Sequence, residues 1–284
     1  MWLYLALLSA LFLGLYDIAK KQALGKNGVM QVLLAATALS TLFLSPFLFK
    51  YELSLQSHLM LMGKALIVST SWISGMIALK LLPITTVSTL KATRPFLVVI
   101  FSILLFGERL NITQWAGVIA AFVALFLLNS SHKDEGISFR SNKGLFAMII
   151  SIVSGVVSAL YDKYIIRGME ALSVQSWGNL YITIILGLCI LILHLRHNAE
   201  SKPFRWDWTL VLIAILITGA DALYFFAIKE DGALLSVVSL LRRCSVLVTF
   251  IAGAFFFKEK VNVKKIFSIL VLMAGLFFLL MGSK

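Results

Sequence analysis

The segment Ser239-Leu240-Leu241-Arg242-Arg243-Cys244-Ser245 places two adjacent arginines inside an apolar run that extends from Ala233 to Phe257. In the first half of the chain, Lys91-Ala92-Thr93-Arg94-Pro95 lies inside a similar run from Thr85 to Phe106. A cation in the hydrocarbon layer of a membrane costs about 2.5–3.5 kcal/mol on insertion scales. Such residues persist only where they face protein, water or a counter-ion. We therefore expect the rest of the chain to fold around these two cationic helices.

The composition is that of a polytopic membrane protein. Of the 284 residues, 60% are hydrophobic and 13% are charged, whereas a soluble chain is roughly 45–50% apolar and about 25% charged. The net charge is +12, and basic loops that flank apolar spans set membrane orientation and meet anionic lipid rather than nucleic acid. We expect an integral, multi-pass protein of the bacterial inner (plasma) membrane, with membrane lipid and no nucleic acid among its partners.

The apolar runs predict an all-α fold of ten transmembrane helices, since one span needs about 20 apolar residues. The ten predicted spans are 2–24, 29–49, 59–80, 85–106, 112–130, 143–166, 173–194, 208–228, 233–257 and 263–281. The polar break at 131–142 divides the chain into two near-equal domains, 1–130 and 143–284, of five spans each.

The two halves repeat each other. Leu15-Tyr16-Asp17 recurs as Leu160-Tyr161-Asp162, and Phe106-Gly107-Glu108-Arg109-Leu110-Asn111 corresponds to Phe257-Lys258-Glu259-Lys260-Val261-Asn262. Five is an odd number of spans, so the second half must enter the membrane from the opposite side. This predicts two inverted repeats, a plan in which transporters bind substrate near the midplane between the halves. The alternative is an old duplication that serves only as a scaffold.

The correspondence also pairs the two cationic helices. Counting back from the repeated motif, Lys91 falls opposite Arg242, and Pro95 falls opposite Val246.

The end of the fourth span carries a family resemblance. A helix that contains Pro95 and ends in Phe106-Gly107-Glu108-Arg109-Leu110, followed by Gln114-Trp115-Ala116-Gly117, resembles the EamA-type family of the drug/metabolite transporter superfamily. The resemblance covers nearly the whole chain, and it implies a secondary transporter that moves small metabolites by alternating access, with both termini in the cytoplasm. The second half departs from the family pattern, with Val246 in place of the proline and Lys258 in place of the glycine. Because family substrates are diverse, the resemblance names no cargo.

Charged residues inside the spans are the candidates for substrate binding. Seven ionisable residues lie well inside: Asp17, Asp162, Asp221, Lys91, Arg94, Arg242 and Arg243. Four cations against three carboxylates favour an anionic or carboxylate-bearing substrate, which a guanidinium binds well. The predicted substrate-binding residues are Arg243, Arg242, Arg94 and Lys91, with Trp72 and Tyr224 as pocket aromatics. The alternative for each cation is a carboxylate partner that only fixes helix packing. Lys64 lies near a predicted span end and is expected to extend its ammonium to the interface.

Three carboxylates are candidates for proton coupling. Asp17 and Asp162 occupy equivalent positions in spans one and six, while Asp221, opposite Trp72, lies deepest and is the first choice. A carboxylate balanced between burial and a nearby arginine can load and release a proton. The alternative for Asp17 and Asp162 is a helix-end ion pair with one of four basic neighbours, namely Lys20, Lys21, Lys163 and Arg167. Glu108 and Glu259 are interpreted as locks of the turns after spans four and nine.

Enzymatic function is not expected. The four histidines lie at loops or span ends and form no metal set, and no Walker lysine loop is present, so we predict no metal and no cofactor. The alternatives are a membrane-embedded enzyme or a passive channel acting on a phosphate- or carboxylate-bearing molecule. We expect a monomer or homodimer. Basic residues concentrate after the odd-numbered spans, which favours termini outside the cytoplasm, against the family resemblance.

Overall fold

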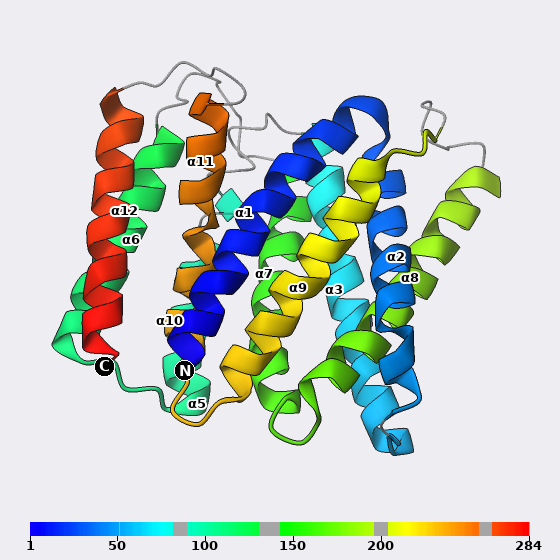
Figure 1. The fold of residues 1–284 in the computed structure, drawn as a ribbon, viewed down its shortest axis with the longest axis horizontal. Coiled ribbons are helices and arrows are strands. Elements are labelled where there is room, and N and C mark those ends of the chain that lie inside the picture. The colour runs from blue at the N-terminus through cyan, green and yellow to red at the C-terminus, as the bar shows by residue number, and fades with distance from the viewer. Residues whose placement is uncertain are drawn as a thin grey trace.

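Helices account for nearly all of the structure, a computed structural model that describes residues 1–50, 52–81, 90–91, 93–130, 143–195, 204–255 and 263–283 (Figure 1). The helices are α1 (Trp2–Lys26), α2 (Val29–Leu48), α3 (Leu55–Leu81), α5 (Arg94–Phe106), α6 (Ile112–Ser130), α7 (Lys143–Ile165), α8 (Ala171–Leu195), α9 (Trp208–Lys229), α10 (Leu235–Arg243), α11 (Ser245–Phe255) and α12 (Val263–Gly282). No strand occurs among the described residues. The predicted loop 131–142, together with Ala92, Lys258, Glu259 and the side chain of Lys21, lies outside them.

Six of the described helices are long and apolar enough to cross a membrane: α1, α2, α3, α7, α8 and α9. Their outward faces are apolar as well. On α8, Leu188, Leu191, Ile192 and Leu195 are all exposed, and their spacing of three to four residues places them on one stripe of the helix. Such a stripe suits lipid rather than water. The prediction of an all-α polytopic membrane protein is therefore confirmed.

The predicted ninth span is not one helix but two. It breaks at Cys244, whose backbone N–H donates to the carbonyl of Leu241 at 3.0 Å. A similar bond lies in the first half, where the Thr93 N–H donates to the Leu90 carbonyl at 3.1 Å immediately before α5. These bonds span three residues rather than four and locally tighten the helix. In the repeat correspondence Thr93 falls opposite Cys244 and Leu90 opposite Leu241, so the two tight turns occupy equivalent positions.

The two breaks do not share a sequence cause. Pro95 follows the first break, and a proline lacks the N–H needed to continue the helical ladder. Val246 takes its place in the second half, where the break persists without a proline. The predicted ninth span, 233–257, is therefore divided at Cys244, a break that no neighbouring proline or glycine in the sequence marks.

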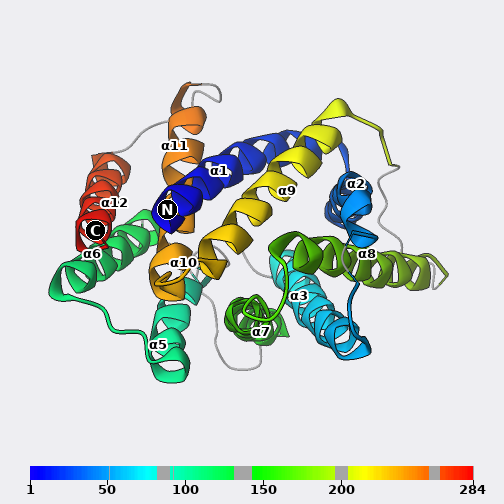
Figure 2. The ribbon, with the colours of Figure 1, turned by 60° about the horizontal axis from the view of Figure 1, so that its bottom comes forward.

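Helices of the first half pair with helices of the second. The closest pairs are α6 with α12, α3 with α7, α1 with α9 and α2 with α8 (Figures 1 and 2). In both views α6 and α12 stand at one edge of the bundle and α2 and α8 at the other. Both chain termini lie at the same end of the bundle (Figure 1). The core is therefore built largely from contacts between the halves.

Serine hydroxyls fasten the two central crossings. On α1, Ser9 Oγ donates to the carbonyl oxygen of Ala220 in α9 at 2.6 Å. Between α3 and α7, Ser71 Oγ donates to the Ser151 carbonyl at 2.8 Å, and Ser151 Oγ donates to the Ser71 carbonyl at 2.7 Å. Ala220 and Ser71 are equivalent positions of the two halves, so the two crossings are fastened at corresponding places.

Glycine permits the close contact of α6 with α12. A Cβ added to Gly117 would lie 2.8 Å from the Gly275 carbonyl oxygen, closer than side-chain carbons approach other atoms. Beside this contact, Asn111 Nδ2 donates to the Gly282 carbonyl at 2.6 Å. Small residues of this kind let membrane helices approach backbone to backbone.

Candidate functional site

Arg242, at the last turn of α10, is bound to α9. Its Nη2 donates to Asp221 Oδ1 at 2.7 Å, and its guanidinium carbon lies 4.3 Å from the centre of the Tyr224 ring. Asp221 and Tyr224 are three residues apart on α9, so both face the same way. The structure thus brings three of the predicted site residues together. The pair is partly open, with 19% of the Arg242 side chain and 31% of the Asp221 side chain exposed.

Asp162 has a buried partner that the sequence did not suggest. Lys64 Nζ lies 2.9 Å from Asp162 Oδ1 and 4.1 Å from the centre of the Phe225 ring. Only 6% of the lysine side chain and 11% of the aspartate side chain are exposed. The expectation that Lys64 extends to the interface was wrong, because α3 begins at Leu55 and places this lysine more than two turns inside the helix.

Lys163, a predicted partner of Asp162, instead contacts the end of α9. Its Nζ donates to the carbonyl oxygens of Ile228 at 3.2 Å and Ala233 at 2.5 Å. These carbonyls lie at the last turn of α9 and in the turn that follows it. A lysine here satisfies acceptors that have no helical donor and complements the negative end of the helix dipole.

Glu108 caps the N-terminus of α10. Its Oε1 accepts from the Leu235 N–H at 2.6 Å, and its Oε2 accepts from the Ser236 N–H at 3.1 Å and from the Ser236 hydroxyl. Leu234, which precedes α10, offers no side-chain cap. The glutamate therefore fastens the turn between α5 and α6 to α10, the cationic helix of the other half. The sequence predicted only that Glu108 stabilises its own turn, so the contact with α10 is an addition.

Arg94 lies flat against α7. Its Nη2 donates to the Gly155 carbonyl at 2.6 Å, and a Cβ at Gly155 would lie 2.5 Å from the guanidinium carbon. Lys91 approaches α3, where its Nζ lies 3.8 Å from the place that a Cβ on Gly75 would take. Three residues apart, these cations therefore reach the two helices of the α3–α7 crossing.

Asp17 lies within electrostatic range of Lys20 and Arg243 near the break in the ninth span. Gly14 packs α1 against this break, since a Cβ there would lie 3.0 Å from the Ser245 carbonyl oxygen. Asp17 follows Gly14 by one turn and attracts both Lys20 and Arg243. Lys20 was considered from the sequence only as a partner of Asp17, and its position one turn further along α1 was the signal that it belongs to the site.

These charges form one cation cluster, defined as Lys20, Lys91, Arg94 and Arg243. Lys20, Arg94 and Arg243 all repel Lys91. Among the described residues, no carboxylate oxygen lies within 4.0 Å of any of the four. Lys91 and Arg243 are exposed. A charge exposed at mid-span needs water or a ligand beside it, because lipid would not solvate it.

Trp72 lies apart from this cluster. It packs among side chains of α2, α3 and α8, including Met30, Ala65 and Leu186. Ser71, its neighbour in the chain, faces α7 instead. Adjacent helical residues point about 100° apart, so the structure places Trp72 on another side of α3.

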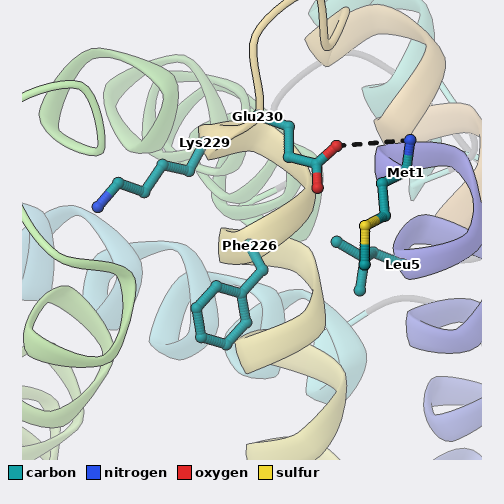
Figure 3. A pocket seen from close by; sticks show the side chains of 5 residues that line it. All are labelled: Met1, Leu5, Phe226, Lys229 and Glu230. Carbon is teal, nitrogen blue, oxygen red and sulfur yellow. Dashed lines mark ion pairs between the residues drawn. The ribbon is translucent and has the colours of Figure 1, made fainter.

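A shallow cavity of about 340 Å³ lies at the end of the bundle where α1 begins and α9 ends (Figure 3). It is lined by Met1, Leu5, Phe226, Lys229 and Glu230. The amino group of Met1 lies 3.5 Å from Glu230 Oε2, as the dashed line in Figure 3 marks. None of the predicted site residues lines this cavity.

Comparisons with known proteins agree on the architecture. A family model described as the EamA-like transporter family matches residues 1–130 and 142–281. A solved structure described only as "Crystal structure of protein" superposes with a TM-score of 0.81 at 14% sequence identity, covering 98% of this chain and 95% of that chain. At this identity the likeness shows a shared fold. No curated protein sequence matches the chain.

Proposed function

The chain belongs to the EamA-like transporter family, and we propose that it is a secondary transporter that moves a small anionic metabolite across the membrane by alternating access. The proposal of an anionic cargo rests on the cation cluster of Lys20, Lys91, Arg94 and Arg243. No described carboxylate oxygen lies within 4.0 Å of any of these four side chains. Such charges are costly inside a membrane protein unless something neutralises them during the working cycle. A cargo anion meets that need.

We propose that the ten spans form two inverted five-helix repeats, 1–130 and 143–284. Three features support it. The first helices of the halves, α1 and α7, begin at opposite ends of the bundle (Figure 1). The tight turns at Thr93 and Cys244 fall at equivalent positions. Each of the closest helix pairs joins one half to the other. Alternating access then consists of one half moving against the other around the midplane.

Polar contacts between the two halves lie at each end of the bundle, and the movement has to break those at the end that opens. At one end, Glu108 holds α10 to the turn after α5. At the other end, Asn27 Nδ2 donates to the Arg205 carbonyl at 3.0 Å, and the Arg205 N–H donates to Asn27 Oδ1 at 2.7 Å. Lys26 also pairs with Asp207 there. Because both sets join the two halves, opening either end requires one set to release.

We divide the predicted binding residues by role on the basis of their exposure and their contacts. Arg243 and Lys91 are exposed and have no carboxylate partner among the described residues, so we assign them to the cargo. Arg242 is held by Asp221 and by the Tyr224 ring, so its role is to position α10 against α9 until a stronger anion competes for it.

We propose that competition between the cargo anion and Asp221 for Arg242 couples transport to protons. While Arg242 binds Asp221, the two charges neutralise each other. If the cargo anion takes Arg242, Asp221 is left without its counter-ion, and we propose that this carboxylate then carries the coupling proton together with the cargo. Asp162, buried with Lys64, is less suited to this cycle, and Asp17 remains the second candidate. We expect Asp221→Asn to abolish proton-driven accumulation while substrate exchange continues, and unchanged accumulation would remove Asp221 from coupling.

Counterflow in liposomes tests the function itself. Purified protein is reconstituted in vesicles preloaded with a panel of unlabelled anionic metabolites, and entry of each labelled counterpart is measured with product analysis. A transporter gives saturable counterflow of chemically unchanged substrate. Flux that rises linearly with concentration would indicate a channel instead, and a chemically altered product would indicate the membrane-embedded enzyme.

A further inference from the structure

We propose that the cation cluster of Lys20, Lys91, Arg94 and Arg243 binds a compact dianion, so that the cargo carries a doubly charged group of the phosphate or dicarboxylate kind. The inference rests on the proposed transport function and narrows its cargo from an anion to a dianion. It also adds Lys20 of α1 to the binding residues.

Two ion pairs are removed from the charge count before the cluster is considered. Lys64 neutralises Asp162 at 2.9 Å, and Arg242 neutralises Asp221 at 2.7 Å. The first pair joins α3 to α7, and the second joins α10 to α9. If either aspartate neutralised one of the remaining cations instead, its present partner would become an unpaired charge.

The remaining described charges are strongly unbalanced. Asp162 also attracts Arg94, but Lys64 already neutralises it. Among the described side chains, four cations, Lys20, Lys91, Arg94 and Arg243, then face one remaining carboxylate, Asp17, which gives a net charge of +3. Arg94 is fixed by its hydrogen bond to the Gly155 carbonyl, a neutral acceptor that leaves its charge in place. The cations come from α1, from residues 90–91, from α5 and from α10, so they approach the site from several directions.

Helix dipoles do not supply the attraction here. α10 ends at Arg243 and α11 begins at Ser245, so the negative end of one helix meets the positive end of the next. Their partial charges largely cancel at the junction. The side chains therefore determine what binds.

The size of the imbalance selects the charge of the ligand. A monoanion would leave a net charge of +2 among cations that already repel one another, whereas a dianion would leave +1. Two guanidinium groups and two ammonium groups together offer more donors than one carboxylate can accept. Phosphate-type groups and paired carboxylates each supply two charges and enough acceptors.

Matched anions test the proposal on the purified full-length protein. Binding is measured by thermal shift and calorimetry at constant ionic strength and about pH 8, where carboxylates are fully ionised. Sulfate is compared with methanesulfonate, and succinate with monomethyl succinate, so that each pair differs mainly in charge. We expect each dianion to bind at least about tenfold more tightly than its monoanion. Sulfate outperforming succinate would indicate a phosphate-type cargo, and the reverse a dicarboxylate.

Charge variants separate the site from general anion effects. Lys91→Gln and Arg243→Gln should each weaken sulfate binding about tenfold or more, while Lys229→Gln, which removes a lysine paired with Glu170 at the bundle end, should leave it unchanged. Asp17→Asn raises the net charge of the site and should tighten sulfate binding. This gain cannot arise from misfolding. Should Lys91→Gln fail to fold, Asp17→Asn still decides the matter.

Three results would overturn the dianion site. They are equal affinity for monoanions and dianions, wild-type sulfate affinity in both cation variants, and no tightening in Asp17→Asn. The transport proposal is judged separately by counterflow. Saturable counterflow of a monoanion without preference for dianions would retain the transporter and reject the dianion site.

Discussion

The buried pair of Lys64 and Asp162 gives the sharpest stability prediction. Lys64→Met removes the ammonium but keeps an apolar chain that can pack on the Phe225 ring, 4.1 Å from the present Nζ. The carboxylate of Asp162, with 11% of its side chain exposed, then has neither its ion-pair partner nor bulk water. Breaking one side of a buried pair costs about 3–5 kcal/mol. We expect Lys64→Met and Asp162→Asn each to lower the free energy of unfolding by that amount.

The double variant distinguishes charge from packing. Lys64→Met combined with Asp162→Asn removes both charges, and replacement of a buried pair by neutral groups is often neutral or stabilising by about 1–4 kcal/mol. The free energy of unfolding is measured in mixed micelles by denaturant titration. Lys229→Met serves as the control, because its pair with Glu170 is 34% and 55% exposed and should contribute only about 0–1 kcal/mol. A double variant as unstable as the sum of the single variants would refute the reasoning.

Four further predictions concern the rest of the molecule. Glu108→Gln should destabilise the protein by about 1–2 kcal/mol in the same titration, since it removes the charge that caps α10. Gly155→Ala should displace Arg94 and weaken substrate binding, whereas Gly178→Ala, with open space around it, should not. The hydrogen bond from Lys26 lowers the pKa of the Asp207 carboxyl group below its ordinary value. This contact therefore stabilises the protein above the ordinary carboxyl pKa, and the stabilisation is lost as the pH falls through the lowered pKa. Hydrogen exchange at the start of α9 should rise only in that acidic range. Finally, a carboxy-terminal phosphatase fusion should be active and a fluorescent-protein fusion dark if the basic residues set orientation, and the opposite pattern would favour the family resemblance.

Helix positions were largely predictable because apolar length is a local property. The predicted spans 29–49 and 143–166 differ from α2 and α7 by a single residue at the carboxyl end. The break at Cys244 was not predictable, since Val246 replaces the proline that marks the first break and no proline or glycine lies beside Cys244. Local composition carries no record of a backbone turn that tertiary contacts maintain.

Side-chain partners were less predictable than helix positions. The charge pattern identified Arg242 and Asp221 as functional candidates but did not pair them, because their contact depends on how α10 meets α9. Lys64 was misplaced by a boundary error of about one turn. Trp72 was expected near the arginines, yet its direction on α3 is set by the crossing that Ser71 makes with α7. Such relations are set by packing between the halves and cannot be read from spacing alone.

Substrate affinity and fold stability measured together on Arg243→Leu test the central claim most directly. Arg243 is an exposed residue whose guanidinium has no described carboxylate within 4.0 Å, so its removal should hardly change the unfolding transition. If it binds the cargo anion, Arg243→Leu should lower apparent affinity in liposome counterflow roughly ten- to hundredfold, with Arg243→Lys intermediate. If Arg243 serves only packing, the variant will unfold more easily while the folded fraction transports with wild-type affinity, and that result would contradict the account.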